Sequence, residues 1–203
     1  MNRCVILAAL SLAPFPVLAE LDFYVGAGVS ATNIDSSGLV SALDRFGLAA
    51  AAEMDKTAFG AQIFAGVDFT RRFGVEVKYS DSGEADDTIA VTDPDSSSSD
   101  TINVEAGMDG FTVYGTATFP FPRRAEAAIK LGYTYQDLDV TVNAMDMSAA
   151  ASNDDDGVAV AGLLRIRFGD HWAVTGELEY WHVDFDDSFD EPLRFSINGE
   201  FRF

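Results

Sequence analysis

The sequence predicts an all-β protein, an eight-stranded antiparallel up-and-down transmembrane β-barrel. Three observations lead to this prediction. Apolar and polar residues alternate in eight segments of about 9 to 12 residues, close to the length that a tilted strand needs to cross a bilayer. Short and long connections alternate between the segments. No helical period of comparable strength appears between them, which argues against parallel βαβ units.

The first four segments are residues 21–30, 58–69, 73–80 and 109–119. One parity of each segment is almost entirely apolar, and the other carries mostly small, polar or charged residues. The apolar parity holds Phe23, Val25, Ala27 and Val29, then Phe59, Ala61, Ile63, Ala65, Val67 and Phe69, then Phe73, Val75, Val77 and Tyr79, and then Phe111, Val113, Gly115, Ala117 and Phe119. Side chains of a strand point alternately to opposite faces, so each segment has one apolar face.

The last four segments repeat the pattern through the final residue. They are residues 128–136, 158–168, 172–181 and 193–203. Their apolar parity holds Ile129, Leu131, Tyr133 and Tyr135, then Val158, Val160, Gly162, Leu164, Ile166 and Phe168, then Trp172, Val174, Gly176, Leu178 and Tyr180, and then Leu193, Phe195, Ile197, Gly199, Phe201 and Phe203. An open strand edge in hydrocarbon leaves backbone groups unsatisfied, so we expect the last strand to pair with the first.

The connections fall into two kinds that alternate strictly along the chain. The sequence predicts tight turns at 70–72, 120–124 and 169–171, and long loops at 31–57, 80–109, 138–156 and 184–191. All turns therefore lie at one end of the barrel and all loops at the other. Outer-membrane barrels show this asymmetry, with short periplasmic turns and long extracellular loops. Most of the 33 acidic residues fall in the loop spans, whereas the turns at 70–72 and 120–124 each contain a pair of arginines.

Residues 1–19 have the pattern of a secretory signal peptide, which leaves residues 20–203 as one barrel domain. Arg3 supplies the positive start, residues 5–12 form a short apolar core, and residues 17–19 form a small-residue cleavage site. The apolar run is too short for a transmembrane helix. Cys4 is the single cysteine and lies within this segment, so the mature chain is expected to contain no disulfide.

The net charge of −20 argues against nucleic acid as a partner, because the phosphates would be repelled. At the same time, 48% of the residues are hydrophobic, a content that a disordered acidic chain lacks. The sequence therefore predicts a folded chain in which acidic and apolar residues occupy different surfaces.

Alternation alone does not say which face is inside, because a soluble lipocalin-like carrier also alternates. The polar faces are expected to pair charges of opposite sign across neighbouring strands. Such charges could neutralise each other in a narrow lumen, whereas a solvated surface needs no such balance. Aromatic residues gather near the segment ends, as in the girdles of membrane barrels. We therefore expect lipid on the apolar face and a lumen ion-pair network. Its predicted members are Glu76, Lys78, Lys130, Arg165, Arg167, Glu177, Glu179, Arg194, Glu200 and Arg202.

The export signal, the first strand FYVGAGVS, the eight segments and the terminal Phe203 together resemble small outer-membrane barrels of the OmpA-transmembrane and opacity-porin type. The resemblance covers essentially the whole mature chain. It implies the outer membrane of a Gram-negative bacterium, contact with the lipid bilayer and lipopolysaccharide, and insertion by the outer-membrane assembly machinery, for which Phe203 is part of the signal. We also expect a monomer. The chain ends with the barrel, so the peptidoglycan-binding role of OmpA is not expected.

Clustered acids in the predicted loops offer the hard oxygen ligands that calcium and magnesium prefer. The candidate ligands are Asp154, Asp155, Asp156, Asp184, Asp186 and Asp187. The EF-hand spacing is absent. We therefore expect no cofactor beyond weakly bound divalent cations, which would bridge the loops to lipopolysaccharide phosphates. The alternative is a solvated surface that resists aggregation.

A structural or surface-interaction role in the cell envelope is the predicted function, without enzymatic activity. His182 and Asp184 share one face near the outer rim, as in the His-Asp pair of omptin-type proteases. Those proteases are larger ten-stranded barrels, so we interpret His182 as a rim residue without chemistry. The alternative function is a small porin-like channel for ions or small solutes, although an eight-stranded interior is usually filled by side chains.

Overall fold

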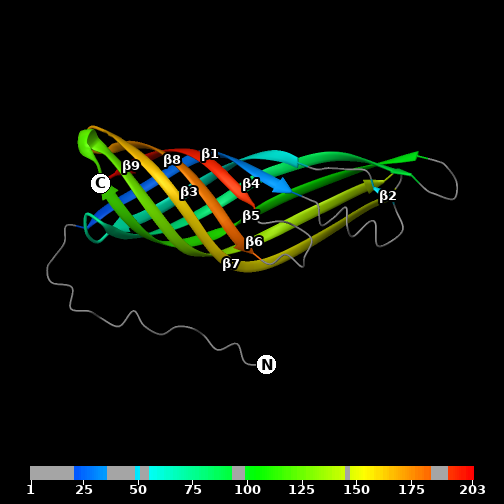
Figure 1. Ribbon diagram of the computed structural model, residues 1–203. Coiled ribbons are helices and arrows are strands. Elements are labelled where there is room, and N and C mark those ends of the chain that lie inside the picture. Colours follow the sequence, from blue (N-terminus) through cyan, green and yellow to red (C-terminus); the bar gives the residue numbers. More distant parts are fainter. Residues whose placement is uncertain (1–20, 36–48, 51–54, 93–98, 145–146, 184–191) are drawn as a thin grey trace, which may run out of the picture.

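The computed structural model describes residues 21–35, 49–50, 55–92, 99–144, 147–183 and 192–203, and nearly all of them are in strands (Figure 1). The strands are β1 (Asp22–Asp35), β2 (Ala49–Ala50), β3 (Asp55–Asp68), β4 (Phe73–Thr92), β5 (Ser99–Pro120), β6 (Ala125–Ala144), β7 (Met147–Phe168), β8 (Trp172–Val183) and β9 (Leu193–Arg202). One short 3-10 helix, η1 (Pro122–Arg124), joins β5 to β6. The part of the chain with described coordinates has no helix that is both long and apolar enough to span a membrane.

Eight long strands close into a barrel by antiparallel pairing. The order around the wall is β4-β3-β1-β9-β8-β7-β6-β5, and β5 pairs with β4. The predicted closure of the last strand on the first is confirmed, because β9 pairs with β1 along its whole length. Beyond that register, Phe203 N donates to Phe23 O at 3.0 Å. The predicted fold class is thus confirmed, and each strand of the wall has two partners, as hydrocarbon requires.

Tight turns join the strands at the end of the barrel where the C-terminus lies (Figure 1). Phe69 N donates to Phe73 O at 2.9 Å, and Phe121 N donates to Ala125 O at 2.8 Å. Connections closed by such hydrogen bonds leave no room for a loop. The three predicted turns are therefore confirmed, including the one at 169–171 between β7 and β8.

The opposite end differs from the prediction. β4, β5, β6 and β7 have 20 to 22 residues each and continue through most of the spans 80–109 and 138–156 that we assigned to loops. That assignment was wrong. Thr92 pairs with Ser99 and Ala144 pairs with Met147, so both hairpins are paired up to their outermost described residues. The four strands form a sheet that projects beyond the barrel (Figure 1); we call it the outer sheet.

The two faces of the wall exchange character where the outer sheet begins. On β5, Phe111 points outward and is 57% exposed, whereas Met108, on the inward parity of the outer sheet, is 4% exposed. On β6, Tyr135 is followed by outward-facing acids, while Leu138 is buried inside. Met108 and Leu138 share a small apolar core with Tyr114, Ala159 and Trp181. This inversion is expected if lipid surrounds the lower part of the wall and water surrounds the upper part.

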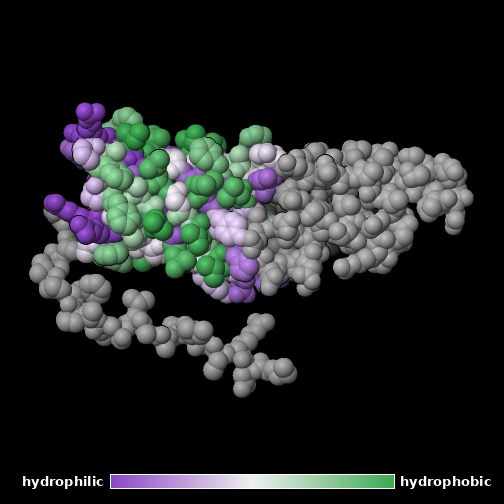
Figure 2. All heavy atoms as spheres, viewed as in Figure 1, coloured by the Kyte–Doolittle hydropathy of each residue, from purple (hydrophilic) through white to green (hydrophobic). Residues whose placement is uncertain are grey.

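The lower wall presents the apolar parity outward, as predicted. On the face seen in Figure 2, hydrophobic residues form a belt across the described part of the barrel, with hydrophilic residues beyond it at the turn end. The aromatic residues expected in the two girdles are 38% to 78% exposed. They are Phe23, Phe59, Phe69, Phe73, Phe119, Tyr133, Tyr135, Trp172 and Tyr180. An apolar surface of this extent is unfavourable in water and favourable in a bilayer.

Glycines and aromatic rings interleave inside the wall between β1 and β3. Tyr24 lies opposite Gly66, and Gly26 lies opposite Phe64 in the register. A Cβ atom on Gly66 would overlap the Tyr24 ring, and one on Gly26 would overlap the Phe64 ring. The absence of a side chain at these two positions therefore lets two large rings lie across the narrow interior.

Candidate functional site: the charged lumen

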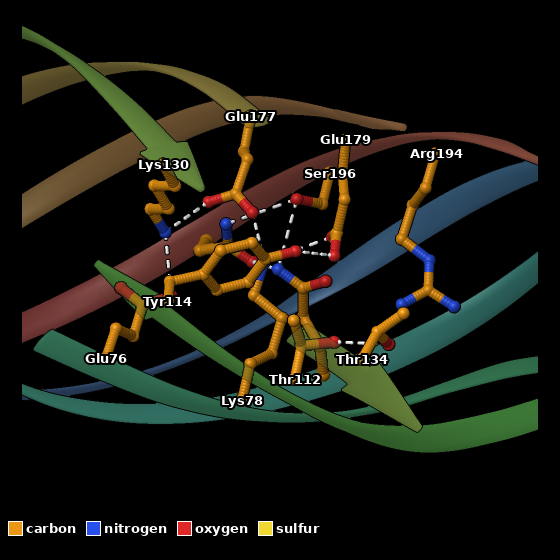
Figure 3. Close-up of polar contacts among 12 residues, drawn as sticks. Glu76, Lys78, Thr112, Tyr114, Lys130, Thr134, Glu177, Glu179, Arg194 and Ser196 are labelled. Atoms are coloured by element: carbon orange, nitrogen blue, oxygen red, sulfur yellow. Dashed lines mark hydrogen bonds and ion pairs between the residues drawn. The ribbon is translucent and has the colours of Figure 1, made fainter. Parts of the chain in front are cut away.

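Five charged side chains gather in the middle of the lumen (Figure 3). We call Glu76, Lys78, Lys130, Glu177 and Glu179 the central cluster. Lys130 Nζ lies 2.7 Å from a carboxylate oxygen of Glu76 and 2.7 Å from one of Glu177. Lys78 Nζ pairs with Glu177 and, at 3.1 Å, with Glu179. All five side chains are at most 2% exposed, so the two lysines, and not solvent, offset most of the charge of the three carboxylates.

The central cluster crosses the whole width of the barrel. Lys78 extends from β4, and Glu177 and Glu179 extend from β8. Three strands separate β4 from β8 in either direction around the wall, so the two strands lie opposite each other. The ion pairs of Lys78 therefore run along a diameter. Side chains from opposite walls therefore meet in the lumen at this level.

Neutral donors complete the coordination of the buried carboxylates. Tyr114 donates its hydroxyl to Glu179 Oε1, and Trp181 Nε1 donates to the same oxygen at 2.6 Å. Tyr24 donates its hydroxyl to Glu76 Oε2 at 3.1 Å. Buried carboxylates are costly unless several donors replace water, and these three aromatic residues supply such donors from β5, β8 and β1.

A second group of ion pairs lies toward the tight turns; we call it the turn-end cluster. Arg202 Nη2 lies 2.9 Å from Asp68, and Arg202 Nε lies 2.7 Å from Glu200. Arg165 Nη2 lies 2.9 Å from the other oxygen of Glu200. The full cluster comprises Asp22, Asp68, Glu126, Arg165, Arg167, Glu200 and Arg202. Arg202 also lies over the Tyr24 ring, 4.9 Å from its centroid, so the two clusters meet at this tyrosine.

Arg194 lies on the outer side of the lumen and contacts Trp181, the residue that donates to Glu179 of the central cluster. Its guanidinium carbon lies 4.2 Å from the centroid of the Trp181 ring, and its Nε donates to Thr32 Oγ1 at 3.1 Å. The side chain is fully buried, and its Nη1 and Nη2 have no hydrogen-bond partner within the described part of the chain. Among the residues with described side chains, no carboxylate lies within ion-pair distance of it.

Nine of the ten residues assigned to the lumen network form ion pairs, but their partners differ from those we expected. We expected charges to pair across neighbouring strands, whereas Lys78 pairs across the barrel. Arg194 was assigned to the network and stacks on a tryptophan instead. The sequence reasoning missed three acids at or near strand ends, Asp22, Asp68 and Glu126. These acids occupy the same alternate positions of their strands as the lumen residues, and this signal could have identified them.

The outer surface of the outer sheet is acidic. Tyr135 donates its hydroxyl to Asp154 at 2.8 Å, and Tyr133 donates to Asp156, so these two acids sit directly above the aromatic girdle. A nearby cavity of about 220 Å³ is lined by Tyr79, Asp81, Glu84, Glu105, Gly107, Met108, Asp109, Asp139 and Thr141. The described residues include no group of three acidic, histidine or cysteine side chains that could hold a metal ion.

Several predicted surface residues lie outside the described residues. Asp184, Asp186 and Asp187 belong to this group, and so does the predicted signal peptide, residues 1–19. His182 is exposed on β8 at the outer rim, opposite Val158 of β7. The predicted proximity of His182 and Asp184 therefore stays a prediction.

The comparison with protein families decides the family of this charged barrel. The sequence model of the outer membrane protein beta-barrel domain matches residues 4–203. The chain belongs to this family. The predicted resemblance and the outer-membrane location are thereby confirmed. No curated protein sequence matches the chain at a significant level.

Solved structures of the same barrel type support this family assignment at the level of the fold. Ail of Yersinia pestis, in complex with the heparin analogue sucrose octasulfate, has a TM-score of 0.59 at 11% identity and covers 91% of this chain and 99% of its own. A major outer membrane protein of Thermus thermophilus also has a TM-score of 0.59, at 9% identity, covering 89% and 99%. OprG of Pseudomonas aeruginosa has a TM-score of 0.55 at 11% identity, covering 90% and 95%.

Proposed function

We propose that this outer-membrane barrel is a structural protein with a closed lumen that presents an acidic sheet at the cell surface. The observation that carries the proposal is the pairing of Lys78 with Glu177 and Glu179 along a diameter of the barrel. An ion could pass only if these pairs were broken. Breaking a buried pair leaves a charge uncompensated, which costs about 3–5 kcal/mol for each pair.

Electrical recording in planar lipid bilayers tests the closed lumen. We expect the purified wild-type barrel to give no unitary current steps. The double variant Lys78→Ala/Glu179→Ala removes the diametric pair and is expected to admit a measurable ion current. Glu84→Gln, a change on the exposed surface of the outer sheet, is the matched control and should stay silent. Regular current steps from the wild type would contradict a closed lumen.

A small channel is the second candidate, and one observation favours it. Several buried polar atoms of the lumen lack hydrogen-bond partners within the described part of the chain: Ser30 Oγ, Gln62 Oε1, Ser80 Oγ, Thr116 Oγ1, Gln136 Oε1, and Nη1 and Nη2 of Arg194. Water molecules usually satisfy such atoms. A hydrated lumen of this kind could conduct ions if the central cluster rearranged. Under this hypothesis, the wild type conducts, and Arg194→Gln, which removes a positive charge from the lumen, shifts the selectivity of the channel toward cations.

The acidic outer sheet supports a surface-interaction role. Its outward-facing carboxylates lie immediately above the aromatic girdle, at the depth of the outer-leaflet head groups. Partial desolvation, and then repulsion by Asp139, Asp109 and Asp154, raises the pKa of Asp137. Carboxylates and lipopolysaccharide phosphates would repel each other at this depth. We therefore propose that loosely held divalent cations bridge them, in contrast to Ail, whose complex contains a polyanion.

Binding of the barrel to lipopolysaccharide micelles tests this role. We expect binding at neutral pH with millimolar magnesium, and loss of binding when a chelator removes the metal. The double variant Asp137→Asn/Asp139→Asn should bind lipopolysaccharide with less dependence on magnesium. Thr118→Val, on the inner face near the turns, serves as the control. Binding that is equally strong without magnesium would contradict the cation bridge.

A further inference from the structure

Four exposed arginines lie on two turns at the periplasmic end of the barrel. Arg71 and Arg72 belong to the turn between β3 and β4, and Arg123 and Arg124 belong to the turn between β5 and β6. We call these residues the arginine turns. The two turns flank the adjacent strands β4 and β5, and Thr118 N donates to Arg72 O at 2.7 Å. This bond holds the first turn against the strand that leads into the second.

The arginine turns carry uncompensated positive charge. No carboxylate pairs with any of the four guanidinium groups among the residues with described side chains. The nearest acids in the sequence are already engaged inside the barrel, since Asp68 pairs with Arg202 and Glu126 pairs with Arg165. In a chain of net charge −20, this rim is a local positive surface that faces away from the acidic outer sheet.

Arg123 and Arg124 occupy backbone conformations that favour other residues. Their φ angles are 68° and 66°, in the left-handed region where a Cβ atom is unfavourable. Glycine or asparagine would adopt these angles more readily. Backbone geometry therefore gives no reason for two consecutive arginines in this turn, and strain of this kind points to a role for the side chains.

Exposed phenylalanines set the depth of the arginine turns in the membrane. Phe69 and Phe73 flank Arg71 and Arg72, and Phe119 and Phe121 precede the second pair. All four rings are 41% to 59% exposed and continue the apolar belt that faces lipid. Guanidinium groups just beyond such a girdle lie at the level of phospholipid head groups.

We propose that the arginine turns bind the phosphates of anionic phospholipids in the inner leaflet of the outer membrane. Guanidinium groups form paired, charge-assisted hydrogen bonds to phosphate, which suits a phosphatidylglycerol or similar head group. Continuity with the lipid-facing belt favours a lipid over a soluble polyanion, because the acyl chains can remain on Phe69 and Phe119 while the phosphate meets the arginines.

Quenching of tryptophan fluorescence by brominated lipids tests the proposal at two points of the same rim. Trp172 is exposed at the start of β8, away from the arginine turns. In the background Trp172→Phe, the change Phe119→Trp places a reporter beside them. The barrel is reconstituted in phosphatidylcholine vesicles with increasing brominated phosphatidylglycerol. The relative binding constant of the two lipids is then measured at each reporter.

We expect phosphatidylglycerol to be preferred about fivefold or more at residue 119 and not at Trp172. Changing all four arginines to glutamine should remove the preference at residue 119, while heat-modifiable gel mobility shows that the barrel remains folded. The change of all four to lysine should keep part of it. Equal affinity of both lipids at residue 119 would overturn the proposal. So would a preference that survives the glutamine changes. Co-sedimentation with peptidoglycan in place of a lipid preference would instead assign the rim to the cell wall.

Discussion

Lys78 Nζ lies 3.1 Å from Glu179 Oε2, although the two residues belong to strands on opposite sides of the barrel. Each member of this pair has a further partner. Lys78 also pairs with Glu177, and Glu179 also accepts a hydrogen bond from Tyr114. The lumen is therefore cross-linked by side chains, and the stability of the wall depends on the charge balance inside it.

The first prediction concerns removal of one charge from the central cluster. Lys78→Met leaves Glu179 and Glu177 short of one cation in a buried site. We expect the free energy of unfolding to fall by about 3–5 kcal/mol, because an uncompensated buried charge is strongly destabilising. Urea titration of the barrel in lipid vesicles, followed by tryptophan fluorescence, measures this change. The triple variant Lys78→Met/Glu177→Gln/Glu179→Gln should recover part of the loss, and a larger loss in that variant would contradict the explanation.

The second prediction concerns the hydroxyl group of Tyr114. Tyr114→Phe preserves the ring over Lys78 but removes the donor to Glu179. Hydrogen bonds to charged groups contribute about 1.5–3 kcal/mol, so a loss of this size is expected in the same unfolding assay. Tyr133→Phe removes a hydroxyl from the exposed face and is the matched control. Equal effects of the two changes would show that burial of the hydroxyl does not matter.

The third prediction concerns the packing of Phe64 against Gly26. Gly26→Ala places a methyl group where the Phe64 ring lies, and overpacking of this kind costs about 1–3 kcal/mol. The double variant Gly26→Ala/Phe64→Leu should unfold at a higher urea concentration than Gly26→Ala alone, because the smaller side chain makes room. Additive losses in the double variant would rule out a steric cause.

The fourth prediction concerns the lipid-facing surface. Leu131 is 61% exposed in the middle of the apolar parity of β6, and Phe119 lies near the turn end of β5. An arginine on the lipid face costs about 2–4 kcal/mol at the midplane and about 0–1 kcal/mol near the interface. Leu131→Arg should therefore destabilise the folded barrel far more than Phe119→Arg. The opposite order would place the membrane at a different height on the wall.

The sequence predicted the barrel because lipid imposes a simple rule on every strand. Residues such as Val77 and Leu131 point outward at each second position, and this periodicity is visible without coordinates. The same rule hid the outer sheet. Above Tyr135 the surrounding medium is water, so Leu138 turns inward and Asp139 outward, and the apolar parity reverses. A search for apolar residues at every second position therefore ends at that level, and the residues beyond it are assigned to loops.

The partners within the lumen could not be predicted in the same way. Parity places Lys78 and Glu179 inside, but it does not say that β4 and β8 are opposite or how far the strands are staggered. Those facts follow from closure of the wall. Arg194 is an example. Alternation correctly places its side chain in the lumen, but it does not predict that the guanidinium group stacks on the ring of Trp181.

The diametric pairs have a consequence for the order in which the chain reaches its native state. Lys78 and Glu179 are 101 residues apart in the sequence, and Gln62 of β3 and Asn198 of β9, which bond over the intervening strand β1, are 136 apart. None of these contacts can form in an isolated hairpin. In an intermediate whose wall is still open, the lysines and glutamates of the lumen would therefore be in contact with solvent. These side chains must lose their water and form their ion pairs when β1 and β9 finally join. Sealing of the cylinder and maturation of its interior are thus a single cooperative event.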